Sequence, residues 1–188
     1  LPENHLWLGG AEYTSTGVEF IANMPTEEVF TLPKKYGVNG IVYSSKPLNY
    51  GGNLIDNFSL TFKSGRVVDC TAEKGLSVLK SIIDTDEGAH YLGEVALVPY
   101  NSPISNSGLV FYNTLYDENA SCHLALGRAY SSCLKGSEDM SKQQLEDNGA
   151  NDSLTHVDFM IGTRDLEISA HTRDGRVLPV FHRGNWAF

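Results

Sequence analysis

Cysteine, basic residues and long apolar segments are all scarce in this chain of 188 residues. The three cysteines, Cys70, Cys122 and Cys133, form neither a disulfide framework nor a CxxC zinc motif, so a reducing, cytoplasmic setting fits best. Lysine and arginine number 14 against 23 acidic residues, giving a net charge of −9 without any basic cluster. This charge balance argues against a nucleic-acid partner. No apolar run approaches the roughly 18 residues of a membrane span, so we expect no membrane partner either.

The remaining composition is typical of an ordinary globular protein. Hydrophobic residues make up 41% of the chain, aromatic residues 10% and charged residues 20%. A chain of this length buries roughly 70% of its unfolded surface on folding, which is enough for one sizeable core. We therefore expect residues 1–188 to form a single domain. Because the chain begins at Leu1 rather than at a methionine, we also expect it to be a piece of a longer protein.

Short apolar segments and tight-turn signals predict a fold built mainly from strands and hairpins. Ser64-Gly65 and Asp174-Gly175 each separate two such segments, as hairpin turns do. Helical spacing of apolar residues predicts a helix over 72–83, and an asparagine cap predicts another over 119–130. Together the elements predict an α+β fold, with a mixed, largely antiparallel curled sheet and two or three flanking helices. The predicted strands cover residues 38–43, 59–69 (as a hairpin), 92–99, 155–161, 166–172 and 177–181.

Residues 134–152 interrupt this pattern. They are polar and acidic and are punctuated by glycine and asparagine. We expect a surface excursion here, with one helical stretch at 140–146. Its acidic part, residues 138–152, is the only basis for a protein-interaction domain as a further interpretation.

A histidine and an aspartate alternate with apolar residues in the segment that begins at His156. Val157, Phe159 and Ile161 would face the core of a strand, so His156 and Asp158 would project together to its other side. An imidazole beside a carboxylate suits a divalent first-row metal, whereas Ca²⁺ takes oxygen ligands only. The alternative is a partly exposed strand face that binds nothing.

A second cluster of acids with a histidine precedes and enters the predicted helix over 119–130. Glu118 stands just before it, and His123 and Tyr130 are seven residues apart, so they would share one helix face. A metal-binding histidine with a phenol beside it is a catalytic arrangement. The alternative is a capped helix whose acids favour the positive end of its dipole. Cys122 and His123 would point about 100° apart on a helix, which disfavours a cysteine nucleophile.

Other carboxylates stand next to apolar strand candidates. Glu94 interrupts the apolar segment 92–99, where it lies either at a sheet edge or buried with a partner. Glu27 and Glu28 follow a proline, and an acidic first helical turn behind a Thr26 cap would explain them without any ligand.

Taken together, five segments resemble the thermophilic metallopeptidases, the group of aminopeptidases T, II and S. They occur in the family's order and cover nearly all of the chain. They are NMPTEEVFT at 23–31, SKPLNYGG at 45–52, LGEVALVP at 92–99, TLYDENASCHLALGRAY at 114–130 and HVDFMIGTRDL at 156–166.

The resemblance implies a zinc-, cobalt- or manganese-dependent aminopeptidase that acts on peptides with a free N-terminus through two metal ions in one site. Tyr130 matches the family's active-site tyrosine, and Glu27 becomes the candidate base once Glu28 is taken as a ligand. Four carboxylates would balance the charge of two divalent ions, and Glu94 is the candidate for bridging them. The implied ligands are Glu28, Glu94, Glu118, His123, His156 and Asp158.

Family members are about twice this length, with an N-terminal α/β domain, and are commonly dimeric. We therefore expect the chain to be the C-terminal, ligand-bearing half of a two-domain homodimeric protein and a poor aminopeptidase on its own. The alternative from another class is a non-catalytic module with a structural ion or an acidic interaction surface. Metal content separates the two interpretations.

Overall fold

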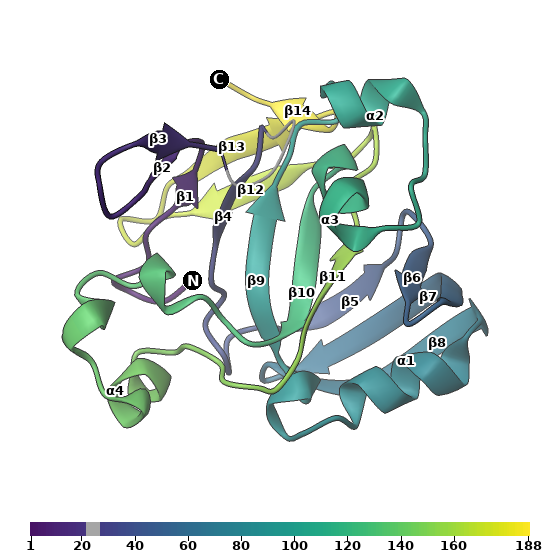
Figure 1. The fold of residues 1–188 in the computed structure, drawn as a ribbon, viewed down its shortest axis with the longest axis horizontal. Coiled ribbons are helices and arrows are strands. Elements are labelled where there is room, and N and C mark those ends of the chain that lie inside the picture. The colour runs from purple at the N-terminus through teal and green to yellow at the C-terminus, as the bar shows by residue number, and fades with distance from the viewer. Residues whose placement is uncertain (22–26) are drawn as a thin grey trace.

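A computed structural model describes residues 1–21 and 27–188 and confirms the α+β fold. A five-stranded sheet in the order β1-β4-β9-β10-β11 runs through the middle of the molecule (Figure 1). Strand pairs in the described residues are antiparallel. The strands of this central sheet are β1 Leu8–Gly9, β4 Val29–Thr31, β9 Leu92–Leu97, β10 His123–Gly127 and β11 His156–Met160.

Three smaller groups of strands surround the central sheet. In the largest, the long strand β7 pairs with β5, β6 and β8, and the turn at Ser64-Gly65 joins β7 to β8 as predicted. The strands of this group are β5 Gly40–Tyr43, β6 Leu48–Tyr50, β7 Asn53–Lys63 and β8 Arg66–Lys74. The second group contains β12 Ile168–His171, β13 Val177–His182 and β14 Asn185–Trp186. The third is the hairpin of β2 Glu12–Tyr13 and β3 Glu19–Phe20.

The helices are short and lie around the periphery of the molecule (Figure 1). None of them, in the described part of the chain, has the length and apolar character needed to span a bilayer. The α-helices are α1 Leu76–Ile83, α2 Pro103–Ser107, α3 Thr114–Asp117 and α4 Lys142–Asp147, and the 3-10 turns are η1 Gly88–His90, η2 Glu118–Ala120, η3 Ser131–Cys133 and η4 Ser137–Asp139.

The main hydrophobic core fills the space between the central sheet, β7 and helix α1. Phe159 of β11 packs its ring 5.6 Å, between centroids, from the ring of Phe58 on β7. Burying side chains of this size supplies much of the folding free energy, about 1.5–3 kcal/mol each. One face of the central sheet is therefore committed to the core, and the other face is left for polar side chains. Further core members are Leu60, Leu79, Ile82, Leu126 and Val157.

The predicted helix over 119–130 is wrong. Residues 118–120 make only one 3-10 turn, and the chain then enters strand β10. Leu124 and Leu126 alternate with His123 and Ala125, a two-residue period that suits a strand between β9 and β11. At Gly127 the backbone has φ 104, and a Cβ there would stand 2.1 Å from the Thr155 carbonyl oxygen. The asparagine cap was a local signal that pairing on both sides of β10 overrides.

Two other helix predictions change in part. The helix predicted over 72–83 begins at Leu76, because residues up to Lys74 complete β8 and Gly75 turns the chain in a left-handed conformation. Glu27 and Glu28 are not helical but lead directly into β4. Thr26, their proposed cap, lies outside the described residues.

Residues 134–152 were predicted as a surface excursion with a helix at 140–146. They contain α4, which begins with a capping box between Ser141 and Gln144. Leu134, Ala150 and Asn151, near the two ends of the segment, are buried. The ends of this segment are thus tied to the body of the protein, and its middle is the exposed part.

Candidate metal centre

Six acidic and imidazole side chains meet on the face of the central sheet opposite the core. The predicted shared face of His156 and Asp158 is confirmed, because His156 Nε2 lies 3.1 Å from Asp158 Oδ1. Three overlapping groups each place one ligand atom per residue within 4.8 Å of the others. These groups are Glu28, Glu94 and His123; Glu94, His156 and Asp158; and Glu118, His123 and Asp158.

Strand register explains why residues far apart in sequence converge. Glu94 on β9 and Asp158 on β11 both pair with Ala125 on β10, so all three point to the same side of the sheet. His123 lies two residues before Ala125 and shares that side. The side chain of Ala125, which lies between the two flanking carboxylates, is only a methyl group. β10 therefore lies beneath the cluster, between the strands that carry Glu94 and Asp158.

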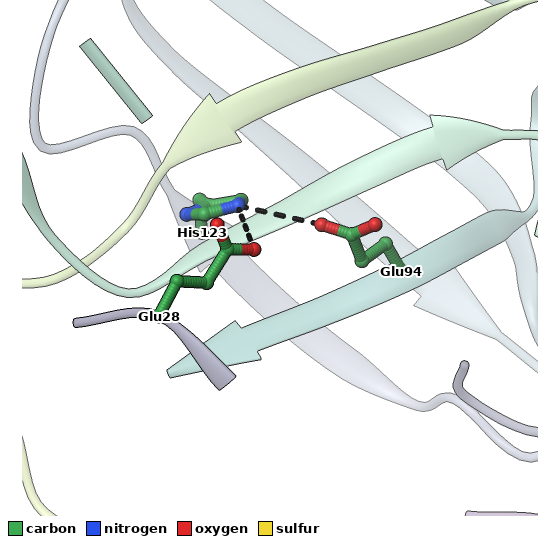
Figure 2. A group of neighbouring side chains, drawn as sticks. All are labelled: Glu28, Glu94 and His123. Carbon is green, nitrogen blue, oxygen red and sulfur yellow. Dashed lines mark ion pairs between the residues drawn. The ribbon is translucent and has the colours of Figure 1, made fainter. Parts of the chain in front are cut away.

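Glu94 stands between the two histidines. Its Oε1 lies 3.4 Å from His123 Nε2, and its Oε2 lies 3.7 Å from His156 Nε2. The residue is only 5% exposed. Figure 2 shows Glu94 and Glu28 approaching the His123 ring from two directions, and Glu28 Oε1 is also 3.4 Å from His123 Nε2. Each oxygen of this one carboxylate thus faces a different imidazole.

Both histidines are oriented by backbone carbonyl groups. His123 Nδ1 lies 3.1 Å from the Ser121 carbonyl oxygen, and His156 Nδ1 lies 2.7 Å from that of Arg128. A carbonyl oxygen only accepts hydrogen bonds, so each Nδ1 carries the proton. In the neutral ring each Nε2 then presents a lone pair toward the carboxylates, which is the orientation that metal-binding histidines have.

Burial and crowding of like charges shift the pKa values of the cluster. Burial, together with the negative charge of Asp158, raises the pKa of Glu118 to about 8. Burial also raises the pKa of Glu94, although His123 opposes this. For His156, burial alone would lower the pKa, but the hydrogen bond and charge of Asp158, the Arg128 carbonyl and the charge of Glu94 together outweigh burial and raise the pKa to about 9. Buried acids in this number call for a compensating positive charge.

Tyr130 lies beside the cluster, but not in the way the sequence predicted. It follows β10 in a turn, and it does not share a helix face with His123. Its ring centroid lies 4.9 Å from that of His156, and the side chain is half exposed. Burial, together with the negative charge of Glu94, raises the pKa of Tyr130 to about 12. The phenol is therefore protonated at neutral pH and can donate a hydrogen bond.

The cavity that contains this cluster has a volume of about 640 Å³. Glu28, Glu94, Glu118, His156 and Asp158 line one part of it. Apolar side chains line another part, namely Leu8, Phe30 and Leu115. A cavity of this size, with polar groups on one wall and apolar groups on another, is typical of a small-ligand or peptide-end site.

Glu27 is set apart from the other predicted site residues. It is exposed, and among the described residues neither the three ligand groups nor the cavity lining includes it. Its role as a base stays a prediction. Conversely, the N-terminal segment 8–12 lines the cavity, and sequence reasoning did not find it. The only local signal was the pair Gly9-Gly10, of which Gly9 is packed against the backbone of Glu28.

Asp86 anchors the loop that leads into β11. Its carboxylate accepts hydrogen bonds from the Ser153 hydroxyl at 2.8 Å and the Leu154 N–H at 2.6 Å, and from the Ala89 N–H at 2.8 Å. Partial burial favours the protonated carboxyl, but these hydrogen bonds outweigh it and hold the pKa of Asp86 below its usual 3.8. The stabilisation from Asp86 is therefore fully present above about pH 4 and is lost as the pH falls through the lowered pKa.

We expect Asp86→Asn to reduce the free energy of unfolding by about 1 kcal/mol near neutral pH, because Asp86 is partly exposed and water offsets some of the loss. In urea titrations from pH 7 to pH 3, the difference in the free energy of unfolding between the variant and the unaltered protein should become smaller below about pH 4. Asp69→Asn, at an exposed position on β8, is the matched control. A difference in the free energy of unfolding that stays constant from pH 7 to pH 3 would contradict the assigned role of the Asp86 carboxylate.

Comparison with known proteins identifies the family to which the chain belongs. The model of the family described as Thermophilic metalloprotease (M29) matches residues 1–186. The chain belongs to this family. The resemblance carried by the five sequence segments is thereby confirmed.

Relatives within the thermophilic metalloprotease family extend over twice the length. The chain is 60% identical to Aminopeptidase AmpS of Bacillus subtilis and 58% identical to Aminopeptidase 2 of Geobacillus stearothermophilus. Each match covers all of this chain and 46% of the relative. Among solved structures, wild-type AmpT from Thermus thermophilus matches with a TM-score of 0.92 at 46% identity, again over the whole chain and 46% of the other protein. The chain thus spans about half the length of these relatives.

The donor set suits divalent transition ions. Two imidazoles, whose Nε2 atoms would ligate in the neutral form, and four carboxylates combine the nitrogen and oxygen ligands that such ions prefer, and the four negative charges would balance two of them. An all-oxygen Ca²⁺ site would not need the two oriented histidines. The residues therefore fit the kind of cofactor that a metalloprotease family implies.

Proposed function

We propose that the protein is a metal-dependent aminopeptidase that removes the N-terminal residue of peptides through a dinuclear site. The observation that supports it most is the position of Glu94, whose two oxygens face the Nε2 atoms of His123 and His156 separately. A carboxylate shared in this way is the arrangement expected of a bridging ligand between two ions. Residues 1–188 would form the ligand-bearing catalytic domain.

The six clustered residues would hold two divalent ions, Zn²⁺, Co²⁺ or Mn²⁺, with Glu94 shared between them. When bound, these ions act as Lewis acids toward the scissile carbonyl and activate water at neutral pH. Backbone carbonyl groups orient both imidazoles before any ion binds, so these ligands would need little rearrangement to hold the ions.

Residues around the ligands would perform the remaining steps. Tyr130, which is protonated at neutral pH, would donate a hydrogen bond to the carbonyl oxygen as negative charge develops there. The free amino group of the substrate would bind a metal ion or a carboxylate of the cavity, which limits cleavage to the first residue. Glu27, next to the ligand Glu28 in the chain, is the proposed base that takes the proton of the attacking water.

Setting and assembly are part of the same proposal. All three cysteines are free thiols, which suits a reducing cytoplasm. The resemblance to the thermophilic metallopeptidases supports a homodimer of the longer protein. Peptides with a free N-terminus are the proposed partners, because the names of the relatives are those of aminopeptidases.

Hydrolysis of leucine p-nitroanilide by the intact natural protein tests this proposal. We expect activity to disappear after treatment with a chelator and to return on addition of Zn²⁺, Co²⁺ or Mn²⁺. An N-acetylated substrate is the matched control and should not be cleaved, because its amino group is blocked. Chelator-resistant activity, or equal cleavage of both substrates, would contradict a metal-dependent aminopeptidase.

A further inference from the structure

The orientation of His156 depends on one backbone carbonyl outside the sheet ladder. His156 Nδ1 is hydrogen-bonded to the Arg128 carbonyl at 2.7 Å, and this contact directs Nε2 toward Glu94 and Asp158. Arg128 follows the last residue of β10. Regular strand pairing therefore does not by itself fix the direction of its carbonyl, and another group has to do so.

Asn151 holds the backbone on both sides of Arg128. Its side-chain Nδ2 donates to the Gly127 carbonyl at 2.6 Å, and its own backbone carbonyl accepts from the Ala129 N–H at 2.9 Å. The second proton of Nδ2 is donated to the Gly88 carbonyl at 2.7 Å. The residue is 2% exposed, so these bonds form away from water. Asn151 thus clamps the three residues whose middle member orients His156.

Only a side chain with two donor protons on one nitrogen satisfies this position. An aspartate would place a carboxylate oxygen, which has no proton, against two carbonyl oxygens. The Oδ1 atom of Asn151 has no hydrogen-bond partner in the described residues, although it is buried. An unpaired buried oxygen costs stability, and the two bonds donated by Nδ2 offset that cost. The two hydrogen bonds that Nδ2 donates are what an asparagine provides at this position and an aspartate cannot.

Neighbouring contacts fix Asn151 in turn. The Arg128 Nε donates to the Ser153 carbonyl at 2.9 Å, and the Arg128 N–H donates to the Thr155 carbonyl at 2.7 Å. Asp86 binds Ser153 from the other side. The segment before β11 and the segment after β10 are therefore fastened to each other over several residues, with Asn151 at the buried end.

We propose that Asn151 is a positioning residue for the metal centre. By fixing the backbone at Gly127 and Ala129, it aims the Arg128 carbonyl at His156 and so holds the His156 ring in its ligating orientation. This inference rests on the proposed function in that it takes His156 as a metal ligand. His123 is oriented separately, by the Ser121 carbonyl, so only one of the two histidines depends on Asn151.

The test compares Asn151→Asp and Asn151→Ala with the unaltered natural protein. Ser59→Ala is the matched control, because it removes a mostly buried side-chain hydrogen bond, to Thr71, between β7 and β8. Imidazole N–H proton resonances of ¹⁵N-histidine-labelled, Zn²⁺-loaded protein report on each ring. Co²⁺ titration followed by visible absorption reports on metal affinity, and kcat and KM for leucine p-nitroanilide report on function.

In both Asn151 variants we expect the His156 Nδ1 proton to exchange faster and its resonance to shift or vanish, while the His123 resonance stays. Affinity for one of the Co²⁺ ions should fall by roughly 10- to 100-fold, with a matching loss in kcat and a smaller change in KM. Ser59→Ala should change none of these readouts.

Three outcomes would overturn the inference. One is an unchanged His156 resonance with Co²⁺ affinity within about twofold of the unaltered protein. Another is an equal loss of Co²⁺ affinity and kcat in Ser59→Ala, which would mean that the effect comes from general destabilisation of the protein. If neither Asn151 variant folds, the unaltered protein decides, because rapid exchange of its His156 Nδ1 proton would show that the Arg128 carbonyl does not fix the ring. Unaltered protein that binds no Co²⁺ would instead refute the proposed function.

Discussion

Replacement of Glu94 by glutamine should abolish aminopeptidase activity in the natural protein while leaving the fold intact. Glutamine has the same shape, but it loses the negative charge that faces both His123 and His156. Metal ions in hydrolytic sites are worth several kcal/mol of transition-state stabilisation, and each 1.4 kcal/mol is a factor of ten. We therefore expect kcat/KM for leucine p-nitroanilide to fall by about a thousandfold or more.

In the metal-free state, we expect Glu94→Gln to be as stable as the unaltered protein or more stable. Burial, together with the negative charge of Asp158, disfavours the charged form of Glu94 when no cation is present. Removal of its charge should leave the urea midpoint of the metal-free variant unchanged or higher. Glu73→Gln, at an exposed acid on β8, is the control and should keep full activity. Retention of more than a tenth of the activity in Glu94→Gln would contradict the bridging role.

Tyr130→Phe should reduce kcat by about 100- to 1,000-fold, the loss typical of one oxyanion donor, and leave KM within a few fold. The hydroxyl is the only group removed, and its raised pKa of about 12 keeps it a donor throughout the range in which enzymes work. Because Tyr130 is not among the proposed ligands, metal content should stay unchanged.

Steady-state kinetics together with metal analysis of the same samples measure this effect. Tyr43→Phe, at an exposed position on β5, is the matched control and should behave as the unaltered protein. A loss of metal in Tyr130→Phe would mean that the phenol supports the site structurally. Undiminished kcat would mean that another group stabilises the developing charge.

Local pattern was sufficient to predict the strands that border the site. The alternation around His156 identified β11 and its polar face, and the apolar segment around Glu94 identified β9. Each prediction depends on side-chain direction within one strand, which a two-residue period determines. The predicted hairpins at Ser64-Gly65 and Asp174-Gly175 are present for the same reason, since turn residues act locally.

Pattern failed where pairing between distant segments decides the structure. The segment 119–130 has an asparagine cap and no early helix breaker, yet it forms β10 because β9 and β11 supply partners on both sides. Its central position also brings Glu94 and Asp158 to the same level of the sheet, which no local rule predicts. The convergence of the six residues was expected from the family resemblance, and the register provides its physical basis.

Groups that act through backbone atoms were beyond sequence reasoning. Asn151 lies in a polar segment that was read as surface, and nothing in its neighbours indicates that it would be buried against Gly127. The N-terminal segment that lines the cavity carries no acid or histidine pattern of its own until Glu12. Such residues are defined by what the fold places next to them.

Metal content of the intact natural protein, measured by inductively coupled plasma mass spectrometry after exhaustive dialysis, tests the dinuclear site most directly. We expect about two transition-metal ions per chain in the unaltered protein and clearly fewer in Glu94→Gln, because that carboxylate faces both histidines. Protein that retains no metal after reconstitution with Zn²⁺, Co²⁺ or Mn²⁺, or that binds Ca²⁺ alone, would contradict the account.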